Sequence, residues 1–280
     1  MAKYPRISVI TVSYNCRECI EKTIKSVTGL SYDNLEYIVI DGGSTDGTAE
    51  IIEQYKDRIA YYVSERDKGI YDAMNKGLAV ATGEWVNFMN AGDFFANKDV
   101  LNSVVEQMED DAVIVHGNII KQCRGFYYFA TPAGADKADV QMPVFHQSTF
   151  VKLSYHRSHP FDISFKSSGD YNFFYNANFR DKCKFQYIPV VVACFDNTGG
   201  MSKDRHALSM RENLRIWKKE HDIIFRIRQE ASLFVYTLKT WIKKTILKPQ
   251  ISGAIELRKC KREGKHCITG IYQAKQTQQE

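Results

Sequence analysis

Acidic residues placed directly after predicted strands are the first candidates for chemistry in this sequence. Asp93 closes the turn at residues 90–93 (Asn-Ala-Gly-Asp), which follows a short apolar strand predicted over residues 85–89. Asp41 is the last residue of another apolar run, residues 37–41. Ligands of open α/β sheets bind outside the carboxyl ends of the strands. The spacing therefore predicts that Asp41 and Asp93 face a crevice, although an acid in a turn is also often a solvated residue.

A third acid, Asp170, opens an aromatic segment that is predicted to be a helix over residues 171–180. A carboxylate here can accept a proton from a hydroxyl group, or it can cap the helix by accepting backbone N–H groups. The spacing supports both roles equally. His146 precedes a strand-like run, and it either contacts a ligand or satisfies a backbone group.

The elements that would position these residues alternate between strands and helices. β-Branched or apolar runs predict strands over residues 7–13, 37–41, 59–64 and 85–89. Amphipathic patterns between them predict three helices. This alternation indicates right-handed βαβ units and a mostly parallel sheet flanked by helices. The turn Gly42-Gly43 is not the glycine pattern of a dinucleotide site, and the sequence contains no P-loop pattern.

The second half of the chain has a different pattern. Short strands are predicted over residues 112–116, 125–129 and 185–195. Apolar residues then recur every three or four positions from residue 203 to residue 248, which predicts a long helix. Residues 203–280 contain 18 Lys and Arg against 8 Asp and Glu, so the excess positive charge lies in this extension.

Composition places the chain among ordinary globular proteins, with 280 residues and a net charge of +5. Its seven scattered cysteines are expected to be the reduced thiols of a cytosolic protein. The amino terminus lacks the apolar core of a signal peptide, and no apolar run approaches ~18 residues. The sequence therefore predicts a chain that neither carries a signal peptide nor spans a membrane.

Seven segments in a fixed order carry a resemblance to a known family. They are ISVITVSYN (7–15), EYIVIDGGSTDGT (36–48), SERDKGIYDAMNKG (64–77), TGEWVNFMNAGD (82–93), HQS (146–148), SGDY (168–171) and GGMS (199–202). Together they resemble the family 2 glycosyltransferases of bacterial surface-polysaccharide assembly (O-antigen, capsule, exopolysaccharide). The resemblance implies an α/β structure of the GT-A fold over residues 1–202, in which 1–110 form the nucleotide-sugar half and 111–202 the acceptor half. Residues 203–280 would form a basic helical extension with a flexible tail.

The resemblance also implies inverting transfer from a nucleotide-diphosphate sugar. Asp170 matches the catalytic base of the family. Asp93 matches a ligand of a divalent metal, Mn²⁺ or Mg²⁺, although family members usually present two or three acids in this turn. The residues expected to bind the nucleotide sugar are Thr11, Tyr14, Asn15, Asp41, Asp67, Lys68 and Asn90. The residues expected near the acceptor or the diphosphate are His146, Gln147, Gly199 and Gly200.

Two of these assignments have structural alternatives. A nucleoside needs a surface for packing and a carboxylate that accepts a base N–H, which Tyr14 and Asp41 would supply. Tyr14 would otherwise pack in the core. Asp41 would otherwise cap a helix or form the turn that follows it.

The extension predicts partners as well. Basic residues beside Trp217, Phe234 and Trp241 suit an anionic membrane surface, and the expected acceptor is a glycan on a polyprenyl-diphosphate lipid. The sequence thus predicts a cytoplasmic enzyme bound peripherally to the cytoplasmic face of the bacterial inner membrane. A helix packed on the catalytic core is the alternative. Nucleic acid is not an expected partner, since no reader motif accompanies the charge.

Two other functions are compatible with this sequence. A sugar-nucleotide nucleotidyltransferase would share the α/β layout, but residues 14–18 lack the glycines expected of its first loop. A non-catalytic glycan-binding module of the same fold would explain the loss of acids from the turn 90–93.

Overall fold

The computed structural model describes residues 4–123, 126–196, 206–219, 221–245, 257–258, 260 and 267–268. The chain forms two compact units. The first consists of Met1–Ile119 and Thr131–Phe195, and the second of Ile120–Ala130 and Asp196–Glu280. This division differs from the predicted boundary at residue 202, because residues 120–130 group with the C-terminal segment, to which they are joined by strand pairing.

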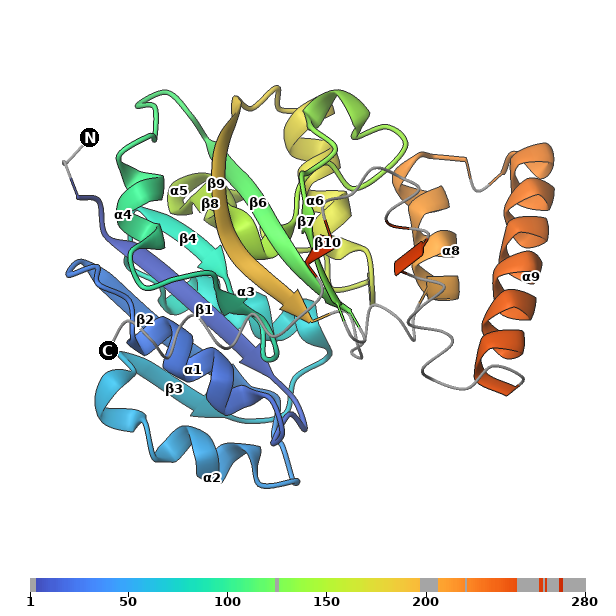
Figure 1. Ribbon diagram of the computed structural model, residues 1–280. Helices are drawn as coiled ribbons and strands as arrows, with labels where there is room; N and C mark the ends of the chain where they lie inside the picture. Colours follow the sequence, from blue (N-terminus) through green and yellow to red (C-terminus); the bar gives the residue numbers. More distant parts are fainter. Residues whose placement is uncertain are drawn as a thin grey trace. The chain divides into compact units, whose positions relative to one another are not determined.

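Four parallel strands form the N-terminal part of the sheet, as predicted (Figure 1). They are β1 (Ile7–Ser13), β2 (Leu35–Asp41), β3 (Tyr61–Ser64) and β4 (Trp85–Phe88), in the order β4-β1-β2-β3. All residues of β1 and β4 are buried, which explains their nearly continuous apolar or β-branched sequences. Ser13 lies opposite Asp41, and Asp41 opposite Ser64, so the carboxyl ends of three strands meet.

Three helices connect these strands. They are α1 (Ile20–Thr28), α2 (Thr48–Glu53), which is followed by the short 3-10 helix η1 (Lys56–Arg58), and α3 (Ile70–Val80). Helix α1 buries Ile20, Ile24 and Val27, a stripe of helical period. Because every connection returns the chain to a parallel strand, the loops after β1, β2 and β4 open at the same edge of the sheet.

The remaining strands of the first unit pair antiparallel, so the whole sheet is mixed rather than mostly parallel. Strand β8 (Thr149–Lys152) lies between β4 and β6 (Ile114–Cys123) and is antiparallel to both. Strand β9 (Phe185–Asp196) pairs with β6 and with β5 (Phe94–Phe95). The other helices are α4 (Val100–Val105), η2 (Ala135–Lys137), η3 (His146–Ser148), α5 (Leu153–Ser158) and α6 (Gly169–Phe179).

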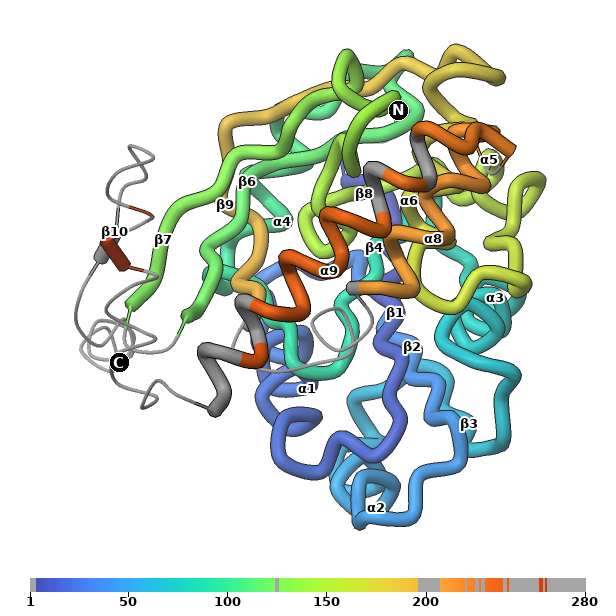
Figure 2. Tube along the Cα trace, turned by 90° about the vertical axis from the view of Figure 1, so that its right-hand side faces the viewer, coloured from blue at the N-terminus to red at the C-terminus, as the bar shows by residue number. Residues whose placement is uncertain are grey.

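The second unit joins a strand pair to two helices. Strand β7 (Phe126–Ala130) pairs with β10 (Cys267–Ile268), and Cys123, Phe126 and Cys260 form a small core beside them. The predicted long helix is divided into α8 (His206–Ile216) and α9 (Ile223–Thr245), which lie side by side in Figures 1 and 2. None of the helices that the structure describes is long and apolar enough to span a membrane.

Candidate active site

Asp41 joins the carboxyl ends of three strands. Its carboxylate accepts hydrogen bonds from the Ser13 hydroxyl (2.9 Å), the Ser44 N–H and hydroxyl (2.8 and 2.5 Å) and the Ser64 hydroxyl (2.6 Å). The residue is 0% exposed. Both carboxylate oxygens therefore accept hydrogen bonds within the protein, which favours the alternative role of Asp41 in the turn over contact with a base.

Tyr14, Gly42 and Asp67 come together at the same edge. Tyr14 is 63% exposed, so its ring is not part of the core. A Cβ atom on Gly42 would lie 2.3 Å from Asp67 Oδ2 and 3.3 Å from Tyr14 Cδ2, so only glycine leaves room for both side chains. The other oxygen of Asp67, Oδ1, accepts the Gly69 N–H at 2.7 Å. An exposed aromatic ring beside a fixed carboxylate is an arrangement that can receive a heterocyclic base.

Thr11, Asn15 and Lys68 each form hydrogen bonds within this edge of the sheet. Thr11 is fully buried, and its hydroxyl donates to the Met89 carbonyl oxygen at 2.8 Å, so its side chain joins β1 to the end of β4. Asn15 has a positive φ of 49° and accepts the Thr45 N–H at 2.9 Å, so it fixes the turn that follows β2. The backbone N–H of Lys68 donates to Asp72 Oδ2 at 2.9 Å.

A residue of α1 holds the turn at residues 90–93 in place. The Thr23 hydroxyl accepts the Gly92 N–H at 2.9 Å and donates to the Asp93 carbonyl oxygen at 2.7 Å. Asp93 is thereby positioned with only 6% of its surface exposed. Asn90 Oδ1 is buried and has no hydrogen-bond partner in the part of the chain that the structure describes.

These oxygen atoms fit a hard divalent cation in part. Amide and carboxylate oxygens are the ligands that Mg²⁺ and Mn²⁺ prefer, and Asn90 and Asp93 offer one of each kind. Within the described ranges, no group of three or more His, Cys, Asp or Glu residues is arranged to hold a metal. The residues present therefore fit a cation that takes most of its ligands from a bound phosphate and from water.

His146 lies between the two acids of the site. Its Nε2 atom is 3.9 Å from Asp93 Oδ2 and 3.3 Å from Asn90 Nδ2, while its Nδ1 atom is 3.5 Å from Asp170 Oδ2. Burial opposes protonation of this imidazole, but the hydrogen bond to Asp170 and the charges of Asp170 and Asp93 outweigh it and raise the pKa of His146. In its protonated form, this imidazole would compensate the charges of the two carboxylates.

Asp170 is the second residue of α6, so it lies within the helix and is not its N-cap. Its Oδ1 atom accepts the Tyr71 hydroxyl at 3.0 Å and the Tyr171 N–H at 2.9 Å. The side chain of Asp170 remains about one fifth exposed, at 21%. A partly exposed carboxylate beside an imidazole can accept a proton from a bound hydroxyl group.

Two further expectations have different outcomes. Gln147 is buried, and its backbone carbonyl oxygen accepts a hydrogen bond from the Asn87 side-chain amide at 3.0 Å, so the residue joins η3 to β4. Gly199 and Gly200 lie outside the described residues. Tyr71 was not among the expected site residues. The one signal for it in the sequence is its place in the segment 64–77, which carries part of the family resemblance.

Comparisons with known proteins agree with the geometry. The family described as glycosyl transferase family 2 matches residues 8–173. An uncharacterised glycosyltransferase of Mycobacterium tuberculosis is 31% identical over 216 residues, which cover 71% of this chain and 78% of that protein. The putative teichuronic acid biosynthesis glycosyltransferase TuaG of Bacillus subtilis is 41% identical over 107 residues, covering 37% of this chain and 42% of TuaG.

A solved structure extends the comparison to most of the chain. The mannosyltransferase PcManGT of Pyrobaculum calidifontis, solved with GDP-Man and Mn²⁺, superposes with a TM-score of 0.55 at 18% identity. The match covers 90% of this chain and 86% of that protein. At this identity the likeness is one of fold, and it confirms the predicted GT-A type of α/β structure.

Proposed function

Because the chain belongs to glycosyl transferase family 2, we propose that this glycosyltransferase acts with inversion, moving a sugar from a nucleotide-diphosphate sugar to a hydroxyl of a glycan. One observation carries the proposal. Asp170, on α6, and Asp93, in the turn after β4, face the two different nitrogen atoms of the same imidazole, that of His146. A base for the acceptor and a group beside the leaving diphosphate must stand on opposite sides of the anomeric carbon in a direct displacement.

In this proposal the donor occupies the edge formed by the loops after β1, β2 and β4. The Tyr14 ring packs on the base, and Asp67 Oδ2 accepts a base N–H. The sugar diphosphate then lies toward Asn90 and Asp93. These residues would hold the divalent cation, which neutralises the leaving diphosphate when bound. Residues 1–110 thus provide the donor half, and residues 111–202 the acceptor half.

Asp170 acts as the general base. Its Oδ2 atom takes the proton of the acceptor hydroxyl while the hydroxyl oxygen forms the new bond to the anomeric carbon. The bond from this carbon to the phosphate oxygen breaks, and its electron pair leaves with the nucleoside diphosphate. His146 lies between the two carboxylates, with Nδ1 facing Asp170 and Nε2 facing Asp93, and its protonated form would offset their mutual repulsion.

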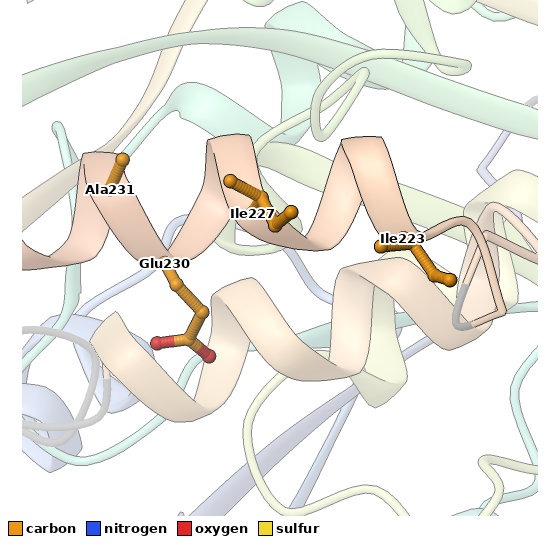
Figure 3. A pocket seen from close by; sticks show the side chains of 4 residues that line it. All are labelled: Ile223, Ile227, Glu230 and Ala231. Carbon is orange, nitrogen blue, oxygen red and sulfur yellow. The ribbon is translucent and has the colours of Figure 1, made fainter.

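The acceptor in this proposal is a surface-polysaccharide glycan on a polyprenyl-diphosphate lipid. The teichuronic acid assignment of TuaG supports the polysaccharide class. An exposed apolar face on α9 supports the lipid, since Ile223, Ile224, Ile227, Phe234 and Trp241 are each more than half exposed. Figure 3 shows a surface pocket that is lined by four residues of this helix, Ile223, Ile227, Glu230 and Ala231.

The apolar face of α9 would bind the anionic lipids of the inner membrane on its cytoplasmic side. The sequence places five basic residues in the same helix, Arg226, Arg228, Lys239, Lys243 and Lys244. An apolar face contributes by burial, and each cation near anionic lipid contributes about 1 kcal/mol. The full chain is therefore expected to co-sediment with phosphatidylglycerol vesicles and to be released by salt.

A matched pair of variants tests this surface. Phe234→Glu places a charge at a position that is 70% exposed on α9, and Val140→Glu does the same at a 59% exposed position of the first unit. We expect the first substitution to abolish co-sedimentation and the second to leave it unchanged. Equal binding by both variants would remove α9 from the proposal.

A donor-hydrolysis screen tests the enzymatic proposal without knowledge of the acceptor. The purified full chain is incubated with UDP-, GDP- and dTDP-sugars, with Mn²⁺ and with excess chelator, and the released nucleoside diphosphate is measured. We expect one donor class to be hydrolysed, and more quickly with Mn²⁺. A nucleotide sugar that binds tightly but is never hydrolysed or transferred would favour the glycan-binding module.

A further inference from the structure

We propose that Tyr71 is a positioning residue for Asp170, which holds one carboxylate oxygen so that the other faces the acceptor hydroxyl. This inference rests on the proposed role of Asp170 as the base. Tyr71 stands on α3, in the donor half of the chain, whereas Asp170 stands on α6, 99 positions later. This hydrogen bond therefore links the base to the half that binds the donor.

The hydrogen bonds of Asp170 distinguish its two oxygens. Oδ1 accepts both the Tyr71 hydroxyl at 3.0 Å and the Tyr171 N–H at 2.9 Å. Oδ2 faces His146 Nδ1 at the longer distance of 3.5 Å. An oxygen that already accepts two hydrogen bonds is a poor proton acceptor, so Oδ2 is the atom suited to receive the proton.

Gly169 shows that the position of the Tyr71 ring is built into α6. A Cβ atom on Gly169 would lie 2.8 Å from Cδ2 and Cε2 of Tyr71 and 2.9 Å from its Cζ. The aromatic ring thus lies directly on the helix backbone, one residue before the base. Any larger residue at position 169 would push the ring, and the hydroxyl with it, away from Asp170.

The tyrosine is itself held firmly from its other side. Its ring, 4% exposed, packs against Phe161 with centroids 5.5 Å apart. Asn75, one turn further along α3, donates to the Phe161 carbonyl oxygen at 2.8 Å and accepts the Phe161 N–H at 2.9 Å. Because these contacts fix α3 to the segment before α6, the hydroxyl has little freedom to leave Asp170.

The chemistry of the hydroxyl suits this role. Burial and the charge of Asp170 raise the pKa of Tyr71 well above that of a free tyrosine. The hydroxyl therefore keeps its proton throughout the neutral range and donates it in the hydrogen bond to Asp170.

The conservative substitution Tyr71→Phe tests the inference, with Tyr32→Phe as its control. Tyr71 is 4% exposed and Tyr32 is 5% exposed, and Tyr32 donates its hydroxyl to the Pro5 carbonyl oxygen at 2.6 Å instead of to the base. Each variant thus loses one buried hydroxyl, but only one loses a hydrogen bond to Asp170. The probe is the UDP-, GDP- or dTDP-sugar that the wild-type chain hydrolyses, with its dissociation constant, kcat and KM measured separately.

We expect Tyr71→Phe to lower kcat by about 10- to 100-fold, the usual effect of a misplaced catalytic group, with KM and donor affinity within about twofold of wild type. Gly169→Ala should lower kcat in the same way, whereas Tyr32→Phe should keep it within about twofold. A wild-type kcat for Tyr71→Phe, measured while Asp170→Asn is inactive, would overturn the inference. A wild-type kcat for Asp170→Asn would instead overturn the base on which it rests.

Discussion

Replacement of Asp41 separates a structural role from a nucleotide-binding role. In the structure its carboxylate accepts four hydrogen bonds, from Ser13, Ser64 and twice from Ser44, and it is shielded from solvent. Each buried donor left without a partner costs about 1–3 kcal/mol. The hydroxyl groups can turn toward one another or toward water, so we expect Asp41→Ala to lower the free energy of unfolding by about 3–5 kcal/mol in total.

Urea denaturation of the full chain measures this loss, with Ser64→Ala as the matched control. The control removes one of the four hydrogen bonds at an exposed residue, so its expected cost is only about 1 kcal/mol. The denaturation midpoint should fall strongly for Asp41→Ala at an unchanged slope. If Asp41→Ala were instead as stable as wild type and had lost nucleotide affinity, the carboxylate would contact the base, and the structural role would be refuted.

The remaining predictions concern the metal and pH. Asp93→Ala should abolish Mn²⁺-dependent hydrolysis of the donor, since the turn offers no second acid; full wild-type turnover in excess chelator would contradict it. Burial lowers the pKa of His116 and His156 to about 4, so both are neutral when folded, while the unfolded chain binds these protons below about pH 6.5. Above that pH neither histidine lowers the free energy of unfolding. On acidification to pH 5, each histidine lowers it by about 2 kcal/mol. His156→Phe keeps a ring on Phe173, and its urea midpoint should fall less than that of wild type between pH 7.5 and 5; an equal fall would show that His156 contributes nothing.

The N-terminal half of the fold follows from local sequence patterns. Strands β1 and β2 are runs that become wholly or almost wholly buried, and a buried parallel strand has no polar face that could obscure the pattern. The helical stripe of α1 is equally plain. The antiparallel strands β8 and β9 are harder to place, because their partners are chosen by contacts between distant parts of the chain.

The prediction of one long helix in the extension is wrong, and the reason is physical. Lys218, shortly after the end of α8, adopts a positive φ of 55°. Glycine is the usual residue in this conformation, so the lysine gives no sequence signal that the helix ends here. The 3.6-residue period of α9 was read correctly, but periodicity does not reveal whether an apolar face is covered. In the structure Ile227 and Phe234 are exposed on that helix.

The site was predictable only in part. Asp93 and Asp170 were found from their segments, but their common approach to His146 depends on the return of the chain through η3 and α6. The structure favours the turn role of Asp41 over the nucleotide role, and no local pattern indicates this, because its three serine partners lie on different segments. Tyr71 has the same difficulty, since its partner is 99 positions away.

The configuration of the released sugar tests the central claim most directly. The wild-type chain is mixed with the α-linked nucleotide sugar that it hydrolyses, and ¹H NMR spectra recorded before mutarotation identify the first anomer formed. A single displacement assisted by Asp170 predicts the β anomer as the initial product. An initial α anomer would mean retention of configuration and would contradict the proposed mechanism.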